Sequence, residues 1–168
     1  MKYIIQIANQ ADAYDIASIN AVAWKHAYAD ILPKEILDSI SIDKWAESWN
    51  AALGQEPIVL KIHSNNRIIG FSQMCKDHHK LQETFGEISS LYLHPDVWRK
   101  GFGSQLCLAS LMLLKDLGFD QATIWVLAAN ERARNFYQSL GFEKSGMSRI
   151  CNLFSMIELD EVQYTKKL

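Results

Sequence analysis

The feature that most constrains the fold of this chain is a nine-residue stretch, WRKGFGSQL, at residues 98–106. It follows a strand-like run, EISSLYLHP, and leads into an apolar periodic segment. Glycine is costly inside a regular element, so Gly101 and Gly103 indicate a tight turn between a strand and a helix. The first N–H groups of a helix are unpaired, and Arg99 and Lys100 add positive charge beside them. The stretch predicts a phosphate or pyrophosphate site; a structural turn with solvated cations is the alternative.

Strands and helices alternate around this turn. Hydrophobic periodicity predicts strands at 3–8, 57–63, 67–75, 83–93, 121–128, 149–159 and 162–168, and helices at 9–27, 33–40, 41–53, 102–117 and 130–140. Asn9 is the expected N-cap of the first helix, and the asparagines of SNN at 64–66 predict a hairpin. A chain of 168 residues is long enough for one well-cored domain. We therefore expect one α/β domain over residues 1–168, with a mixed central sheet flanked by helices.

Two further patterns locate helix ends and the core. Glycines mark the expected helix stops, at positions 54, 118 and 141. The helix after the glycine turn should direct one apolar stripe to the core: Phe102, Leu106, Ala109, Leu113 and Leu117.

Composition excludes several classes of function. The formal net charge of −2 gives no electrostatic reason to expect a nucleic-acid or anionic-membrane partner. No apolar run approaches the ~18 residues of a membrane span, and the few apolar residues before Gln6 and Asn9 are too short a run for a signal sequence. The three cysteines are well separated, and the five histidines have no metal-ligand spacing. We expect a cytoplasmic protein with reduced thiols and no metal.

A second motif, NERARNFYQSLGF at 130–142, follows the next predicted strand. A P-loop would end in Gly-Lys-Ser/Thr, and a dinucleotide fingerprint needs a small residue where Leu106 stands, so neither fits. Together the two motifs resemble the GNAT superfamily of acyl-CoA-dependent N-acyltransferases, whose glycine turn follows Gln/Arg-x-x-Gly-x-Gly/Ala. Trp98 departs from that pattern. The resemblance covers residues 83–142 closely and the N-terminal part loosely.

The resemblance implies that acetyl-CoA is a co-substrate. In the family the turn holds the pyrophosphate, and a bulge, here expected at Ser89 and Ser90, separates two strands so that pantetheine lies between them. The resemblance implies cofactor contacts at Leu91, Tyr92, Leu93, Trp98, Arg99, Lys100, Gly101, Phe102, Gly103, Ser104, Asn130, Arg132, Ala133 and Phe136. Asn130 is also a plausible helix N-cap, and the two roles are compatible.

The resemblance also implies two catalytic residues. Tyr137 corresponds to the family tyrosine that protonates the departing CoA sulfur, although its position also suits a core residue. Glu87, at the head of EISSLYL, corresponds to a general base acting through water, although a solvated charge at a strand end is the alternative. No cysteine or serine has a convincing activating partner, so transfer in a ternary complex is expected.

The acceptor is the least defined part of the prediction. The family's acceptor pocket usually forms near residues 25–33, which makes Trp24, His26, Tyr28 and Asp30 candidate contacts. The expected reaction acetylates a primary amine of a small molecule or peptide. A non-catalytic acyl-CoA-binding module and a nucleotide-binding domain unrelated to CoA are the alternatives. A tail strand could pair subunits in a homodimer.

Overall fold

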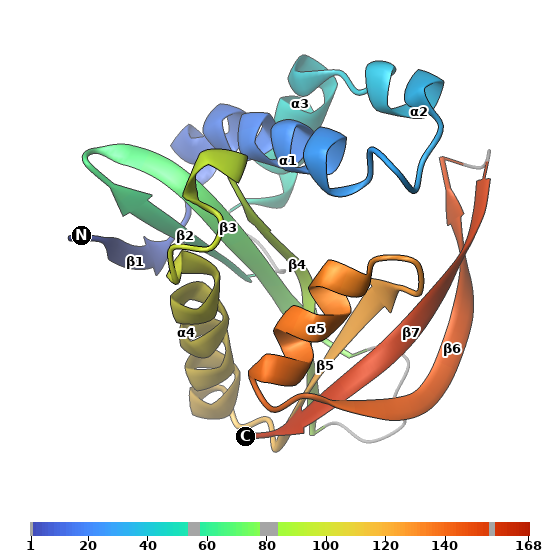
Figure 1. Cartoon of the computed structure of the whole chain (residues 1–168). Helices are drawn as coiled ribbons and strands as arrows, with labels where there is room; N and C mark the ends of the chain where they lie inside the picture. Colours follow the sequence, from blue (N-terminus) through green and yellow to red (C-terminus); the bar gives the residue numbers. More distant parts are fainter. Residues whose placement is uncertain (1, 54–57, 78–83, 155–156) are drawn as a thin grey trace.

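The computed structural model describes residues 2–53, 58–77, 84–154 and 157–168 (Figure 1). One seven-stranded sheet has the order β1-β2-β3-β4-β5-β7-β6. Its strands are β1 (Ile4–Ile7), β2 (Ile58–Ser64), β3 (Arg67–Lys76), β4 (Phe85–Leu93), β5 (Gln121–Leu127), β6 (Glu143–Leu153) and β7 (Ile157–Lys167). The helices are α1 (Ala13–Ala27), α2 (Lys34–Asp38), α3 (Ile42–Ala52), α4 (Phe102–Asp116) and α5 (Glu131–Ser139), with short 3₁₀ turns η1 (Gln10–Asp12) and η2 (Pro95–Val97).

Neighbouring strands are antiparallel except for β4 and β5, which are parallel. The predicted mixed sheet is therefore confirmed. The hairpin between β2 and β3 is also confirmed, because Asn65 and Asn66 both take positive φ, 52° and 59°.

Helices cover both faces of the sheet (Figure 1). Successive side chains of a strand point to opposite faces, so adjacent residues enter different cores. Val59 of β2 packs in one cluster with Ile16 of α1, whereas Leu60 packs in another with Leu106 of α4. We call these two sides the α1–α3 face and the α4–α5 face.

The sheet opens between β4 and β5. These strands pair through only three residues each, 85–87 and 121–123; beyond them β4 pairs with β3 alone and β5 with β7. Gln73 lies opposite Ser90 and Met74 opposite Ile88, so Ser89 is an extra residue in β4. A bulge of this kind bends its strand and ends regular pairing. The predicted bulge is confirmed, and the two strands diverge beyond it.

Helix ends follow the glycine pattern where the structure describes them. After α4, Gly118 has φ of +91°, and the N–H of Phe119 donates to the Leu114 carbonyl at 3.1 Å. The Gly118 N–H donates to Lys115, which completes a Schellman motif. Gly141, with φ of +81°, follows α5 in the same way. The third expected stop, Gly54, lies outside the described residues.

Two boundary predictions are wrong. The predicted strand 149–159 runs from the second half of β6 into the start of β7, and β7 begins at Ile157 instead of 162. β6 is an edge strand whose first residues are exposed, so EKSGMS carries no alternation and the apolar signal starts late. The prediction that Asn9 is an N-cap is confirmed: it caps the short turn η1, which leads directly into α1.

The predicted stripe of α4 is also partly wrong. Leu117 is 50% exposed because the helix ends at Asp116, and Ala109 and Leu113 are only partly buried. The buried positions are Phe102, Leu106, Cys107, Ser110, Leu111 and Leu114. The sheet therefore buries a wider face of α4 than one row of residues at i, i+4 spacing. The hydrophobic periodicity alone does not predict this width.

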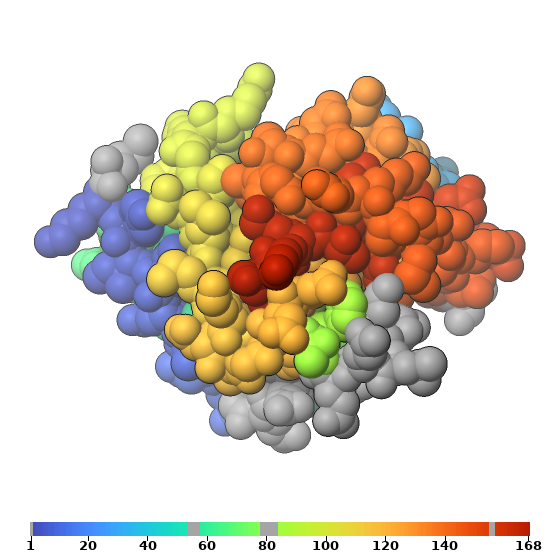
Figure 2. Space-filling model, turned by 90° about the horizontal axis from the view of Figure 1, so that it is seen from below, coloured from blue at the N-terminus to red at the C-terminus, as the bar shows by residue number. Residues whose placement is uncertain are grey.

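Seen from below, the C-terminal residues of β7 emerge in the middle of the molecular face, between α4 and the segment containing α5 and β6 (Figure 2). None of the three cysteines is in a disulfide. Across the described ranges, no helix combines the length and apolarity needed to cross a bilayer.

Candidate active site

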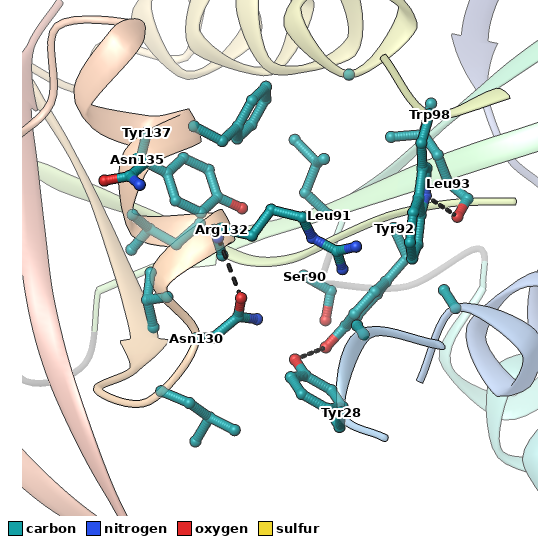
Figure 3. A pocket seen from close by; sticks show the side chains of 18 of the residues that line it. Tyr28, Ser90, Leu91, Tyr92, Leu93, Trp98, Asn130, Arg132, Asn135 and Tyr137 are labelled. Atoms are coloured by element: carbon teal, nitrogen blue, oxygen red, sulfur yellow. Dashed lines mark hydrogen bonds between the residues drawn. The ribbon is translucent and has the colours of Figure 1, made fainter. Parts of the chain in front are cut away.

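A cavity of about 970 Å³ occupies the opening between β4 and β5. It is lined by the bulged half of β4, the second half of β5, the glycine turn, the first turns of α5 and the end of α1 (Figure 3). Most residues implicated by the sequence line it: Tyr28, Leu91, Tyr92, Leu93, Trp98, Arg99, Gly101, Gly103, Ser104, Asn130, Arg132, Ala133, Phe136 and Tyr137. Because β4 and β5 diverge, the cavity connects the two faces of the sheet.

The glycine turn leaves its backbone open, so that a bound group can approach it closely. Gly101 has φ of +85°, a left-handed conformation that side chains rarely adopt, and it immediately precedes α4. The first bond across this end runs from the Gln105 N–H to the Gly101 carbonyl, so the preceding N–H groups have no helical acceptor. A Cβ on Gly103 would lie 3.5 Å from both Leu93 and the Phe136 ring. Gly101 thus supplies the backbone conformation and Gly103 keeps space beside Phe136.

Trp98 forms a platform for an arginine from the other motif. Its Nε1–H donates to the Leu93 carbonyl at 2.8 Å, which fixes the ring, and the Arg132 guanidinium carbon lies 4.0 Å from the ring centroid (Figure 3). This is a cation–π contact between the loop before α4 and the start of α5. Burial lowers the pKa of Arg132, Tyr28 opposes that effect, and nearby Arg99 adds to it. Arginine remains charged under these conditions, so two guanidinium groups lie near the turn.

Two predicted cofactor contacts do not reach the cavity wall. The Lys100 ammonium donates to the Asp96 carbonyl at 2.7 Å on the exposed side of the turn. Phe102 is buried in the core and packs edge-on against Tyr3, with ring centroids 6.0 Å apart. Both flank the site without lining it.

Tyr137 directs its hydroxyl into the cavity (Figure 3). Its ring is held by edge contacts with Phe136 and Phe142, at centroid distances of 5.0 and 5.6 Å. Burial, with smaller contributions from Cys107 and Tyr28, raises the pKa of Tyr137 well above the usual value for a phenol. The side chain is therefore protonated at neutral pH. It belongs both to the core and to the cavity wall.

Asn130 both caps a helix and lines the cavity. Its Oδ1 accepts a hydrogen bond from the Ala133 N–H at 3.1 Å, which caps α5 as predicted (Figure 3). The residue also lines the cavity.

Glu87 lies where β4 and β5 part, opposite Cys75 of β3 and Thr123 of β5. Burial raises its pKa to about 7, Asp77 and Glu161 add to the rise, and Arg149 opposes it. Asp77 is fully buried and accepts a hydrogen bond from the Thr123 hydroxyl at 2.7 Å. Glu87 is partly buried, so it is not the fully solvated charge of the alternative interpretation, and it does not itself line the cavity.

Of the four candidate acceptor contacts, only Tyr28 lines the cavity. Its hydroxyl lies 3.1 Å from that of Tyr92 (Figure 3). Trp24 packs behind this pair, 5.1 Å from the Tyr28 ring. The His26 ring nitrogen lies 3.0 Å from the Val22 carbonyl, and Asp30 is exposed between α1 and α2.

Sequence reasoning missed Glu161, a carboxylate on β7 that lines the cavity. Its Oε2 accepts a bond from Arg149 Nε at 2.7 Å, and the Arg149 guanidinium carbon lies 4.2 Å from the Trp125 ring centroid. The alternation of residues in β7 could have indicated that Glu161 points inward. It shares a face with Ile157 and Leu159, which pack against α2. The predicted strand began one residue too late to include it.

Among the described residues, no group of three or more His, Cys, Asp or Glu side chains is arranged to hold a metal ion.

Known proteins that this chain resembles in sequence are named as acetyltransferases. The YuaI protein of Bacillus subtilis, an uncharacterised N-acetyltransferase, is 23% identical over 140 residues, 83% of this chain and 80% of that protein. Spermidine N(1)-acetyltransferase of Thermoplasma acidophilum is 23% identical over 138 residues, 79% of this chain and 83% of that protein. Mycothiol acetyltransferase of Rhodococcus jostii is 28% identical over 137 residues; this chain spans only 43% of its length.

The fold has solved counterparts. The PaiA N-acetyltransferase of Thermoplasma acidophilum, crystallised with coenzyme A, superposes with a TM-score of 0.76 over the whole of both chains at 21% identity. A sequence profile described as the acetyltransferase (GNAT) family matches residues 13–142, which include the glycine turn, Glu87 and the Tyr137 motif. The chain belongs to the acetyltransferase (GNAT) family of acetyl-CoA-dependent N-acetyltransferases.

Proposed function

We propose that this protein transfers an acetyl group from acetyl-CoA directly to a primary amine while both are bound. The observation that carries the proposal is that one cavity contains the glycine turn and the Tyr137 hydroxyl and opens to both faces of the sheet. A co-substrate can enter from the α4–α5 face and an acceptor from the α1–α3 face, so that the two meet between β4 and β5.

The α4–α5 face suits the phosphate groups of CoA. The unpaired N–H groups at the start of α4, together with Arg99 and Arg132, provide donors and positive charge for an anion. Leu91, Tyr92 and Leu93 lie in the part of β4 that β5 does not pair, which suits the amide groups of the pantetheine arm. Acetyl-CoA supplies a thioester, whose acyl carbon is open to attack by a neutral amine.

Tyr137 is the proposed general acid. A phenol kept protonated by burial can donate its proton to the sulfur that departs as a thiolate. The contacts with Phe136 and Phe142 hold the ring in place, so its hydroxyl is positioned before the reaction begins.

Glu87 is the proposed general base. A primary ammonium must lose a proton before the amine can attack, and a carboxyl with a pKa of about 7 can accept protons near neutral pH. Because Glu87 lies just outside the cavity wall, its action on the amine goes through a water molecule.

Direct transfer is favoured over an acylated enzyme. The cavity wall contains no cysteine among the described residues, and burial raises the pKa of Cys107 to about 12. A thiol in that state is a poor nucleophile.

The test is a screen of amine acceptors with acetyl-CoA in which release of the CoA thiol and formation of the acetylated amine are both measured. The relatives named for mycothiol and spermidine justify including small amino sugars and polyamines beside amino acids and peptides. We expect stoichiometric acetylation of at least one class, at a rate roughly 10²-fold lower in Tyr137→Phe. Binding of CoA without turnover across the whole panel would contradict the proposal.

A further inference from the structure

The charged side chains that line the cavity differ between its two faces. Among the described residues that line it, the charged side chains are Arg99, Arg132 and Glu161. The two arginines belong to the loop before α4 and the start of α5, on the α4–α5 face. Glu161 comes from β7 and shares the α1–α3 face with Ile157 and Leu159. The carboxylate on the side proposed for the acceptor is paired with Arg149, which does not itself line the cavity.

Glu161 is held in place before any ligand arrives. It is the direct cross-strand partner of Arg149, and the bond between Arg149 Nε and Glu161 Oε2 is 2.7 Å long. Arg149 is held in turn against the Trp125 ring. The Glu161 side chain is only 13% exposed, and among the described residues no donor bonds its second oxygen, Oε1. A fixed, nearly buried carboxylate with one free oxygen is suited to bind a cation.

The cation that Glu161 binds is not the amine that reacts. The reacting nitrogen must be neutral when it attacks, whereas an ion pair with a carboxylate favours the protonated ammonium. A group that remains charged throughout the reaction has no such conflict. Tyr28 and Trp125 also line the cavity, and the Arg149 guanidinium that holds Glu161 lies against the Trp125 ring.

Building on the proposed function, we propose that Glu161 binds a second cationic group of the acceptor. The preferred acceptors are then linear diamines or polyamines, in which one nitrogen reacts while another is paired with Glu161. Monoamines of equal length would leave this carboxylate without its ligand.

The experiment compares a series of linear α,ω-diamines with monoamines of matching length. We expect kcat/KM of the parent to be roughly tenfold or more higher for the best diamine, the size expected for a bond to a charged group. In Glu161→Gln the loss should be roughly tenfold larger for the diamine than for the monoamine. Glutamine keeps an oxygen for Arg149, which limits structural damage.

Glu158→Gln is the matched control. It removes the same charge from the same strand, but Glu158 is exposed and alternation places it on the opposite side of β7. The preference for diamines should survive this change. Equal preferences in Glu161→Gln and the parent, or a parent that acetylates monoamines as well as diamines, would overturn the inference.

A binding measurement separates this inference from the proposed function. With CoA present and no acetyl donor, the diamine should raise the Tm of the parent and of Glu158→Gln but not that of Glu161→Gln. An equal rise in all three proteins would overturn the role of Glu161. Absence of any acetylation, with the differential rise intact, would count against the proposed function and leave the cation site supported.

Discussion

The two sides of the cavity are built in different ways. On the α4–α5 face, the wall comes from two continuous segments, 98–104 and 130–137, each at the start of a helix. On the α1–α3 face, single residues are brought together from distant elements: Tyr28 from the end of α1, Tyr92 from β4 and Glu161 from β7. The first side combines the backbone groups of the glycine turn with nearby side chains, and the second depends on side chains alone.

This difference matches the proposed division of labour. A backbone cradle can be kept while other residues change, which suits a co-substrate shared by a whole family. A wall made of separate side chains can change one residue at a time, which suits acceptors that differ between relatives. Substitutions on the α4–α5 side should therefore change the affinity for CoA, and substitutions on the α1–α3 side should change kcat/KM for the acceptor.

The largest effect is expected where the two sides meet. Tyr137→Phe removes the proposed proton donor and little volume, so kcat should fall roughly 10²-fold while CoA affinity changes little. Steady-state kinetics and calorimetric CoA titration measure the two quantities. Tyr164→Phe is the control, because it removes a hydroxyl from a buried tyrosine that does not line the cavity. A kcat for Tyr137→Phe within threefold of the parent, with chemistry rate-limiting, would reduce Tyr137 to a core residue.

Glu87→Gln should lower kcat/KM by roughly 10- to 100-fold at neutral pH. The parent rate should rise with pH through the Glu87 pKa of about 7, because the base must be deprotonated to act. At higher pH more of the free amine is neutral, so the defect of the variant should shrink. Rate profiles from about pH 6 to 9.5 test this, and parallel profiles without loss at neutral pH would exclude Glu87 as the base.

The same variant makes a stability prediction. The pKa of Glu87 is raised from 4.5 to about 7, so its protonated form stabilises the folded state below pH 4.5, and this contribution is lost as pH rises through 7. Glu87→Gln should therefore flatten the fall in Tm across that window. An unchanged slope would mean that Glu87 does not titrate as described.

Gly103→Val should weaken CoA binding roughly tenfold or more by placing a branched side chain beside Phe136 at the cavity wall, a loss of about 1.4 kcal/mol. Gly103→Ala is the matched comparison, because its Cβ would make only ordinary contacts at 3.5 Å. Calorimetry should rank the CoA affinities parent, Ala and Val in descending order. Equal affinities in folded parent and Val variants would show that the cradle does not bind CoA through this wall.

The smallest binding effect concerns the platform that holds Arg132. Trp98→Leu should weaken CoA binding about 2- to 5-fold, the scale of an exposed cation–π contact, and Trp98→Phe should weaken it less. Combined with Arg132→Gln, Trp98→Leu should cost little more than Arg132→Gln alone. Additive losses would show that the two side chains act independently.

Local patterns in the sequence determined much of the α4–α5 side. Gly101, Gly118 and Gly141 all adopt the left-handed conformation that helix boundaries require, and Asn130 caps α5. These features depend on neighbours within about one helical turn, so a short stretch of sequence contains the information needed to predict them. The bulge at Ser89 is different, because the sequence shows only a break in alternation and the bulge itself is defined by the pairing of β4 with β3.

Only the tertiary structure decided which distant side chains meet. The Trp98–Arg132 contact joins two motifs that are separate in the chain, and Glu161 reaches the cavity because β7 pairs with both β5 and β6. The predicted strand began at residue 162, after Glu161, so the prediction left this residue outside the sheet. On the side proposed to bind CoA, the glycine turn and the cap of α5 could thus be predicted from residues close in sequence, whereas the Trp98–Arg132 contact could not. The side proposed to bind the acceptor depends on the pairing of the strands and on the divergence of β4 from β5.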